Sequence, residues 1–210
     1  VEFWGKREQR ASLEAADTLE NHHWLVARIQ GHPRLEKPPL SRWLIASFMA
    51  ATGRRDEGIV RLPAAISALL ITGLVYSLGK RLDGRSTGLS AAMILCATPF
   101  FIGEMRQAGS DGLLALCATA AHYAAWRRLE PGHRRWNLLF YVALALGILA
   151  KGPIILVLVG VTLVPHLAMT RQLKNGLPSL IDAWGLLICS GLSLAWPILV
   201  ILDDPRALGV

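Results

Sequence analysis

The sequence predicts an all-α, polytopic membrane protein with about six transmembrane helices and additional helices at the membrane surface. Of its 210 residues, 53% are hydrophobic and 18% are charged, whereas a soluble domain averages roughly 45–50% apolar and about 25% charged residues. The apolar residues come in long blocks, and most cations fall in short clusters between them, as in the loops of membrane proteins. The blocks and the charge clusters together favour a bilayer over one large soluble core.

The same pattern excludes several classes of protein. The net charge of +7 could suggest nucleic-acid binding, but such proteins gather their cations on one face, so we expect no nucleic-acid partner. There is no glycine-rich loop of the Rossmann or P-loop type, which argues against a soluble nucleotide donor. The three cysteines lie within apolar blocks, where we expect small buried side chains rather than a disulfide or metal set: Cys96, Cys117 and Cys189.

Residues 1–61 are expected to form a juxtamembrane segment outside the cytoplasm. Its first part is polar, and residues 10–19 have the spacing of an amphipathic helix. The apolar face of this helix should carry Leu13, Ala16 and Leu19.

A second helix is expected at residues 40–51, which are apolar on most sides. About a dozen helical residues cover only about 18 Å, whereas the hydrocarbon core is about 30 Å thick. We therefore expect this helix to lie in the membrane interface, anchored by Arg42 and Trp43.

Six longer apolar blocks are expected to form a transmembrane bundle over residues 62–202. They cover residues 62–79, 86–103, 112–126, 136–150, 152–169 and 177–202. Two of them have only 15 residues, which is short for a membrane span.

The charge of the connecting segments predicts the orientation of the bundle. Segments 80–85, 127–135 and 171–174 carry net charges of +2, +3 and +2, and they are every second connection. The positive-inside rule places all three in the cytoplasm, so the other connections, including residues 203–210, lie outside with residues 1–61. Seven ionisable residues then share the outer side: Glu8, Lys37, Arg61, Glu104, Arg106, Asp111 and Lys151.

Lys37 and Lys151 repeat one local arrangement. Lys37 is followed by two prolines and Lys151 by a Gly-Pro pair, so each lysine stands just before a helix that proline can start. With Arg61 or Arg106, two such lysines would form a cationic pocket for a phosphate or diphosphate at the membrane surface. The alternatives are a solvated lysine at Lys37 and, at Lys151, a lysine that extends from its turn towards water.

Two further polar features also have simple alternatives. Asp111 stands directly before an apolar block, and ionisable residues at such depth are usually functional or paired, but Asp111 could instead cap its helix. His22 and His23 could suggest a metal pair. Because neighbouring helical residues point apart and no cysteine or third histidine is near in sequence, we expect no metal site.

A series of motifs occurs in a specific order along the chain. Residues 34–44 read Arg-Leu-Glu-Lys-Pro-Pro-Leu-Ser-Arg-Trp-Leu, followed by Arg-Leu-Pro-Ala-Ala at 61–65 and Gly-Lys-Arg-Leu-Asp-Gly-Arg at 79–85. Residues 106–111 then precede an apolar helix, and residues 147–153 read Gly-Ile-Leu-Ala-Lys-Gly-Pro. This order, over nearly the whole chain, resembles the bacterial branch of the protein O-mannosyltransferase superfamily, which includes the lipid A aminoarabinose transferases.

The resemblance implies a membrane glycosyltransferase of the GT-C fold, of which this chain would be the N-terminal half. The donor would be a sugar on a polyprenyl phosphate, and the acceptor a lipid, glycan or protein. The site would face the periplasm from the bacterial inner membrane. No cofactor or metal is implied, because lysines can supply the charge that Mg²⁺ supplies elsewhere.

The resemblance also assigns the site residues. Lys37 and Lys151 would hold the donor phosphate, and Asp111 would be the second acidic residue. The first acidic motif departs from the family pattern, because Arg7 replaces its aspartate and an alanine replaces its tyrosine. Glu8 could then serve in place of the missing aspartate, and either Glu8 or Asp111 would be the carboxylate that takes the acceptor proton.

Two other classes remain open from the sequence. The altered first motif suits an inactive family member, and charges beside glycine and proline breaks also suit a transporter or a non-catalytic subunit. The chain begins without an initiator methionine and stops just after an apolar block, so we expect it to be part of a longer protein.

Overall fold

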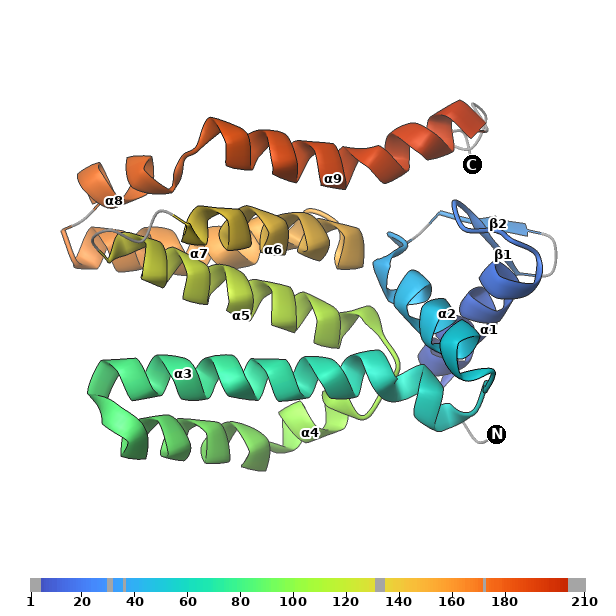
Figure 1. The fold of residues 1–210 in the computed structure, drawn as a ribbon, viewed down its shortest axis with the longest axis horizontal. Coiled ribbons are helices and arrows are strands. Elements are labelled where there is room, and N and C mark those ends of the chain that lie inside the picture. Colours follow the sequence, from blue (N-terminus) through green and yellow to red (C-terminus); the bar gives the residue numbers. More distant parts are fainter. Residues whose placement is uncertain (1–4, 30–31, 36, 131–134, 172, 204–210) are drawn as a thin grey trace.

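The computed structural model describes residues 5–29, 32–35, 37–130, 135–171 and 173–203. Within these ranges the chain forms nine helices and two short strands. The long helices run side by side in a bundle, and a small N-terminal unit lies at one end of it (Figure 1). The fold is therefore helical, as expected, with one strand pair that the all-α prediction lacks.

The N-terminal unit consists of two helices and an antiparallel strand pair. Its elements are α1 (Lys6–Glu20), β1 (Ala27–Ile29), β2 (His32–Arg34) and α2 (Leu40–Thr52). In the strand pair, Ala27 lies opposite Arg34 and Arg28 opposite Pro33. Because proline has no N–H to donate, it suits an edge position in a pair as short as this one.

The buried face of α1 agrees with the predicted one only in part. Leu19 packs against the apolar cluster as expected, but Leu13 is 57% exposed, whereas Glu8, Ala15 and Thr18 are buried. Ala15 belongs to the same apolar cluster as Ile45 of α2, and its small side chain allows the two helices to approach closely. Glu8 and Thr18 can be buried because each of them is hydrogen-bonded. The spacing of apolar residues in the sequence does not reveal these hydrogen bonds.

Helix α2 has 13 residues and lies outside the bundle (Figure 1). It begins directly after Pro39 and ends at Gly53, whose φ of 65° lies in the left-handed region that glycine adopts without strain. At 1.5 Å per residue this helix is about 20 Å long, shorter than a hydrocarbon core. A position in the membrane interface therefore stays the prediction for it.

Helix α3 (Glu57–Ala97) is a hairpin of two legs. The first leg contains the predicted block 62–79, whereas the predicted block 86–103 is divided at Thr98 between the second leg and the next helix, Pro99–Met105. The chain reverses near Gly84, whose φ is 89°. A Cβ atom on Gly79 would lie 2.8 Å from the Cα of Gly88, and one on Gly88 would lie 2.6 Å from the carbonyl oxygen of Tyr76. The legs can therefore meet backbone to backbone only because these positions are glycine.

The other helices complete the bundle: α4 (Pro99–Met105), α5 (Ser110–Leu129), α6 (Trp136–Lys151), α7 (Ile154–Met169), α8 (Leu173–Leu180) and α9 (Ala183–Asp203). Helices α5 and α6 make the most extensive contact, and alanines of α5 such as Ala121 and Ala124 share a core with Phe140 of α6. Where α6 meets α7, a Cβ on Gly147 would lie 2.0 Å from Ile155. Small residues thus set the spacing of these helices.

Tyr141 joins α6 to the segment that starts α9. Its ring packs so closely on Gly185 that a Cβ there would lie 2.0 Å away. The buried hydroxyl donates a 2.9 Å hydrogen bond to the carbonyl of Leu180 and accepts a 3.0 Å bond from the N–H of Asp182. Both bonds satisfy backbone groups where the chain turns between α8 and α9.

The bundle carries helices of membrane-spanning character. Among the described residues, α3 and α9 are long and apolar enough to cross a membrane, while α6 and α7 are shorter apolar helices. Large apolar side chains cover the outside of the bundle, including Leu69 (75% exposed), Met93 (70%) and Leu187 (62%). Such an exposed apolar surface suits contact with lipid, and the number of six spans stays a prediction.

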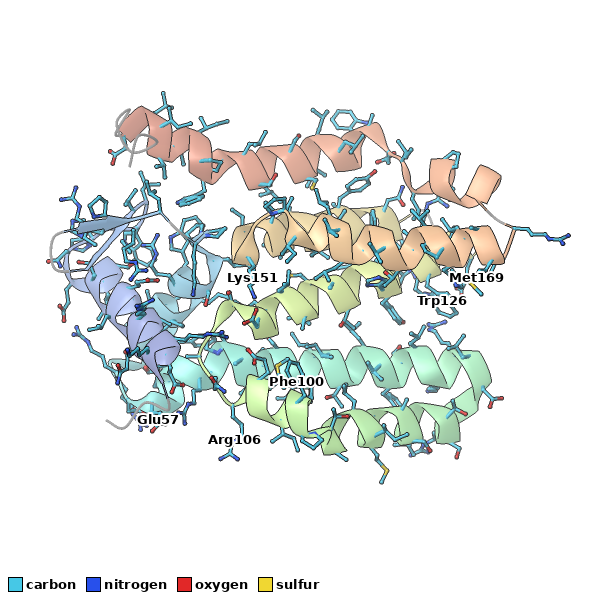
Figure 2. The ribbon with its side chains drawn as sticks, turned by 180° about the vertical axis from the view of Figure 1, so that it is seen from behind. Glu57, Phe100, Arg106, Trp126, Lys151 and Met169 are labelled. Atoms are coloured by element: carbon cyan, nitrogen blue, oxygen red, sulfur yellow. The ribbon has the colours of Figure 1, made fainter. Side chains whose placement is uncertain are left out.

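The N-terminal unit lies at the end of the bundle where α5 begins and α6 ends (Figure 1). Figure 2 shows Glu57, Arg106 and Lys151 towards this end and Trp126 and Met169 towards the other. Arg106 and Lys151, two of the residues that loop charge predicts on the outer side, therefore lie at the same end of the bundle.

The last helix also reaches the N-terminal unit. The indole N–H of Trp196 in α9 donates a 2.8 Å hydrogen bond to the carbonyl of Leu25. This bond joins residues that are 171 positions apart in the sequence, and it fixes the loop between α1 and β1 against the bundle.

Candidate functional site

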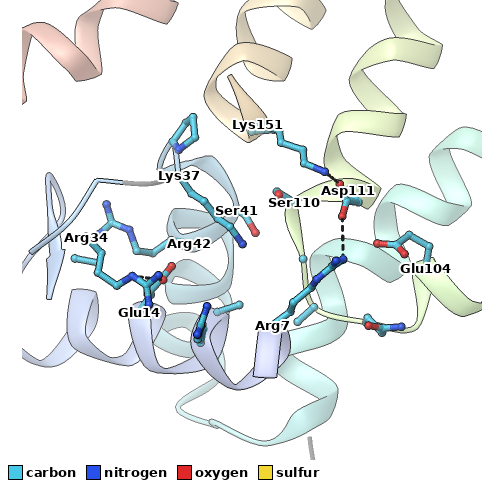
Figure 3. Close-up of a pocket in the computed structure, with 18 residues that line it drawn as sticks. Arg7, Glu14, Arg34, Lys37, Ser41, Arg42, Glu104, Ser110, Asp111 and Lys151 are labelled. Atoms are coloured by element: carbon cyan, nitrogen blue, oxygen red, sulfur yellow. Dashed lines mark hydrogen bonds and ion pairs between the residues drawn. The ribbon is translucent and has the colours of Figure 1, made fainter. Parts of the chain in front are cut away.

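A cavity of about 300 Å³ lies between the N-terminal unit and the adjoining ends of α5 and α6 (Figure 3). Its lining is dominated by charge. Six basic and three acidic side chains contribute to it: Arg7, Arg10, Arg34, Lys37, Arg42 and Lys151, with Glu14, Glu104 and Asp111. An excess of cations beside a membrane-type bundle suits an anionic ligand such as a phosphate.

The structure brings the two predicted lysines to this one cavity. Lys37 lies just before α2 and is held by the two prolines that follow it, while Lys151 is the last residue of α6. Within the described residues, Lys37 makes no ion pair or hydrogen bond, and its side chain is exposed to the cavity (Figure 3). Lys37 is therefore available for an anion.

Lys151 is bound to Asp111 across the cavity. Its ammonium group donates a hydrogen bond to the Asp111 carboxylate, and a guanidinium nitrogen of Arg7 lies 4.0 Å from the other carboxylate oxygen (Figure 3). The side chains of Lys151 and Asp111 are 41% and 30% exposed, so solvent screens the pair in part. Lys151 is therefore paired in the structure, although its side chain also reaches solvent, as the alternative of a lysine extending towards water expects.

Asp111 does not cap α5, which was the alternative to a functional role. The capping position is Gly109, no side chain caps this end, and Asp111 lies in the first turn. A carboxylate in the first turn and a lysine at a helix end both suit the helix dipole. The Asp111–Lys151 pair thus holds the start of α5 to the end of α6.

Glu104 is a cavity residue that sequence reasoning placed on the outer side without assigning it to the site. Its carboxyl group lies beside that of Asp111 (Figure 3). Burial raises the pKa of the Glu104 carboxyl, and the neighbouring Asp111 raises it further, against smaller opposite effects of Arg7 and Lys151. Glu104 therefore binds its proton more tightly than an ordinary glutamate.

Glu8 does not line the cavity, although the sequence suggested it as a base. Its carboxylate is 1% exposed and accepts hydrogen bonds of 2.6 and 2.8 Å from Arg61 and one of 3.0 Å from the N–H of Ala108. Arg61 also pairs with Glu57. Neither Glu8 nor Arg61 contributes to the lining, so this cluster joins α1, α3 and the segment before α5.

Arg106 also lies outside the cavity lining. Figure 2 shows its side chain pointing away from the bundle. Arg7 lines the cavity instead. Its place at the aspartate position of the first acidic motif is the sequence feature that indicates this location.

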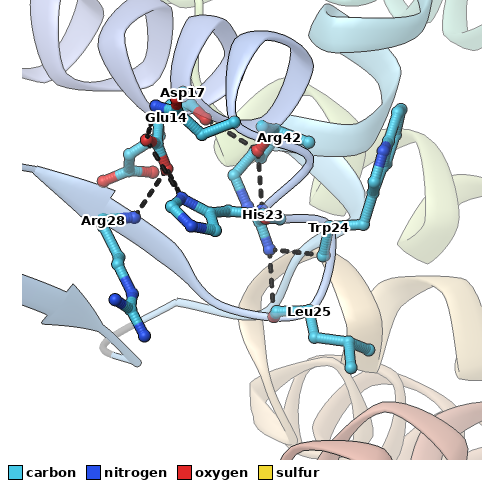
Figure 4. Close-up of polar contacts among 9 residues, drawn as sticks. Glu14, Asp17, His23, Trp24, Leu25, Arg28 and Arg42 are labelled. Atoms are coloured by element: carbon cyan, nitrogen blue, oxygen red, sulfur yellow. Dashed lines mark hydrogen bonds and ion pairs between the residues drawn. The ribbon is translucent and has the colours of Figure 1, made fainter.

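Arg42 forms one wall of the cavity and organises the N-terminal unit (Figure 4). It was predicted as an interfacial anchor, but its side chain is only 7% exposed. Its guanidinium donates hydrogen bonds to the Thr18 hydroxyl (2.7 Å) and to the carbonyls of His23 (2.6 Å), Trp24 (3.0 Å) and Leu25 (3.2 Å). Arg42 therefore fixes the loop after α1 rather than contacting lipid headgroups.

The histidine pair takes no part in the cavity. The Nδ1 atom of His23 lies 3.0 Å from a carboxylate oxygen of Asp17 (Figure 4). In the part of the chain that the structure describes, no group of three or more His, Cys, Asp or Glu side chains could hold a metal ion.

Comparison with known proteins gives a consistent set of relatives. The family described as dolichyl-phosphate-mannose-protein mannosyltransferase matches residues 36–196. An undecaprenyl phosphate-alpha-4-amino-4-deoxy-L-arabinose arabinosyl transferase of Pseudomonas aeruginosa (strain UCBPP-PA14) is 28% identical over 201 residues, which are 92% of this chain and 36% of that protein. The putative mannosyltransferase YkcB of Bacillus subtilis (strain 168) is 23% identical, over 81% of this chain and 24% of that protein.

The fold also matches solved structures. Crystal structures of ArnT from Cupriavidus metallidurans, in the apo state and bound to undecaprenyl phosphate, superpose with TM-scores of 0.90 and 0.89 at 24% identity. They cover 97% of this chain, which in turn covers 38% of theirs. The chain thus spans a little over a third of the length of these relatives and shares the fold of that part.

Proposed function

The chain belongs to the dolichyl-phosphate-mannose-protein mannosyltransferase family, and on this premise we propose that it is the donor-binding part of a membrane glycosyltransferase. The enzyme moves a sugar from a polyprenyl phosphate to a lipid, glycan or protein acceptor. The observation that carries this proposal is that Lys37 and Lys151, from distant parts of the sequence, line one cationic cavity together with Asp111.

The cavity supports binding of the donor phosphate. Lys37 makes no ion pair or hydrogen bond within the described residues, and it is held on a proline-rich segment, so binding an anion costs little ordering of the backbone. Lys151 faces the same space. Undecaprenyl phosphate is bound in one of the structures that share this fold, and a lipid-linked phosphate would place its chain along the apolar bundle.

The proposed reaction is one direct displacement. The acceptor oxygen or nitrogen forms a bond to C1 of the sugar while the bond from C1 to the phosphate oxygen breaks. The polyprenyl phosphate leaves with that electron pair and gains one negative charge, which Lys37 and Lys151 stabilise. A carboxylate takes the acceptor proton, and of the two that the sequence suggested, Glu8 and Asp111, only Asp111 lines the cavity. The anomeric configuration inverts.

The proposed location is the bacterial inner membrane, with the cavity facing the periplasm. The membrane-length helices support insertion. The positively charged segment at residues 80–85 lies around the reversal of α3, at the end of the bundle opposite the N-terminal unit (Figure 1), which suits a cytoplasmic position for that end.

The test is a transfer assay with the full-length protein in membranes. The donors are 4-amino-4-deoxy-L-arabinose and mannose, each radiolabelled and linked to undecaprenyl phosphate. A lost charge-assisted hydrogen bond costs about 1.5–3 kcal/mol, so Lys37→Ala should lower transfer at least tenfold. Lys6→Ala is the matched control, because Lys6 lies on the same unit and does not line the cavity.

The outcomes separate the proposal from its rivals. Unchanged transfer by Lys37→Ala would remove Lys37 from the donor site. Label that crosses the membrane without becoming attached to an acceptor would indicate a transporter. A wild-type protein that transfers neither sugar but binds undecaprenyl phosphate would indicate an inactive family member.

A further inference from the structure

The three carboxyl groups of the cavity differ in how they are engaged. Glu14 lies 3.8 Å from Arg34 on the side of the N-terminal unit. Asp111 is held between Lys151 and Arg7. Each oxygen of the Asp111 carboxylate thus faces a cation, Lys151 on one side and Arg7 on the other.

Glu104 is placed differently. Within the described residues it forms no ion pair, and the neighbour that it contacts is another carboxyl group, that of Asp111. It lies in the last turn of α4, and its side chain turns into the cavity beside Asp111 (Figure 3). It is therefore the cavity carboxylate whose electron pairs are least occupied by cations.

We infer that Glu104 is the base that removes the acceptor proton, and that Asp111 is a positioning residue which holds Lys151 at the donor phosphate. This inference rests on the proposed function. As the acceptor oxygen or nitrogen bonds to C1 of the sugar, its proton passes to a Glu104 carboxylate oxygen. The lysines meanwhile receive the leaving phosphate, so proton removal and charge stabilisation are performed by different groups.

The surroundings of Glu104 suit this role. The charged groups that face it are Asp111 on α5, Arg7 on α1 and Lys151 on α6. Burial and the Asp111 charge raise the pKa of Glu104, and the two cations oppose them without reversing the shift. A base with a raised pKa is a stronger proton acceptor.

The inference predicts the pH profile of transfer. Only the ionised form of Glu104 accepts a proton, so transfer falls as pH decreases through its pKa. Because that pKa is raised, the acid limb lies above the pH at which an ordinary glutamate, with a pKa of about 4.3, would titrate.

The test compares Glu104→Gln with wild type in the full-length protein. Glutamine keeps the shape of the side chain but accepts no proton, and general-base catalysis is worth about 10²–10⁴-fold. Glu104→Gln should therefore lower kcat at least tenfold, remove the acid limb and leave binding of undecaprenyl phosphate unchanged. Glu20→Gln is the matched control, because Glu20 is 51% exposed at the end of α1 and does not line the cavity.

Each result decides the inference. A loss of kcat of less than tenfold in Glu104→Gln overturns the inference. A larger loss of kcat with the acid limb of the pH profile retained also overturns it, because a positioning residue would give that pattern. If Glu104→Gln has no measurable transfer, Glu104→Asp is the deciding variant. It should transfer sugar slowly and retain the acid limb of the pH profile. A Glu104→Asp protein that is inactive but still binds undecaprenyl phosphate contradicts the inference. Absence of transfer by wild type would instead reject the proposed function.

Discussion

Replacing Arg42 with alanine should loosen the loop that follows α1. The guanidinium of Arg42 is the centre of four hydrogen bonds, three of them to consecutive carbonyls of that loop. Alanine removes all five donors of the side chain and leaves the acceptors in place. The size of the effect depends on which acceptors have a second donor.

The structure distinguishes these acceptors. The carbonyl of Trp24 also accepts a 2.7 Å hydrogen bond from the Trp43 indole, and the carbonyl of Leu25 accepts one from the Trp196 indole. Within the described residues, the carbonyl of His23 has no other donor. The His23 carbonyl is part-buried, and an acceptor orphaned by burial costs about 1–3 kcal/mol. The three other lost Arg42 bonds add to it, so we expect about 2–4 kcal/mol of local destabilisation.

Hydrogen–deuterium exchange of the full-length protein in detergent measures this change. A loss of 2–4 kcal/mol corresponds to about 30- to 1000-fold lower protection, expected in the loop at residues 22–28 and not in α6. The matched control is Arg28→Ala, because the Arg28 side chain is exposed in the same segment. A change of less than tenfold in Arg42→Ala, equal to that of the control, would show that the loop is held by other contacts and would refute the reasoning.

Three further predictions concern stability. Gly88→Val should lower the melting temperature in detergent, because its Cβ would meet the Tyr76 carbonyl at 2.6 Å and overpacking costs about 1–3 kcal/mol; a melting temperature equal to wild type would contradict the close packing of the α3 legs. Tyr141→Phe should cost about 1–3 kcal/mol, because it removes the hydrogen bond to the buried carbonyl of Leu180; an unchanged free energy of unfolding in chemical denaturation would show that this hydroxyl does not stabilise the fold. Burial alone would raise the pKa of Asp17, but its hydrogen bonds outweigh burial and lower that pKa. Asp17 therefore stabilises the N-terminal unit at pH values above its unfolded pKa. This stabilisation is lost as the pH falls through the lowered pKa of the folded state. Exchange measured against pH should show that loss in wild type and not in Asp17→Asn.

The features that could be predicted from sequence are those fixed by local chemistry. Proline after Lys37 and Gly-Pro after Lys151 define where each lysine stands, and loop charge places both on one side of the membrane. The structure adds that they face the same cavity. Block length likewise separated α2 from the long helices, because helix length follows directly from residue count.

The features that sequence could not provide depend on helix rotation and on contacts between distant segments. Glu8 looked like a site residue until the rotation of α1 placed it against Arg61 and Ala108, where a buried carboxylate needs such partners. Glu104 reaches the cavity because the chain breaks after α4 and returns as α5. The position of Arg42 in an apolar helix predicts a membrane anchor. Its burial is explained instead by hydrogen bonds to the carbonyls of a loop that is distant in sequence.

The hydrogen bond from Trp196 to Leu25 joins a loop that is synthesised early to a helix that is synthesised late. Its two residues are 171 positions apart, and a ribosome adds about 5–20 residues per second. Leu25 is therefore synthesised about 10–30 s before the indole that binds its carbonyl. During that interval the loop after α1 lacks this hydrogen bond, which can form only after α9 has been made. This contact of the N-terminal unit thus depends on a helix made late in the described segment, although most of the side chains that line the cavity lie earlier in the sequence.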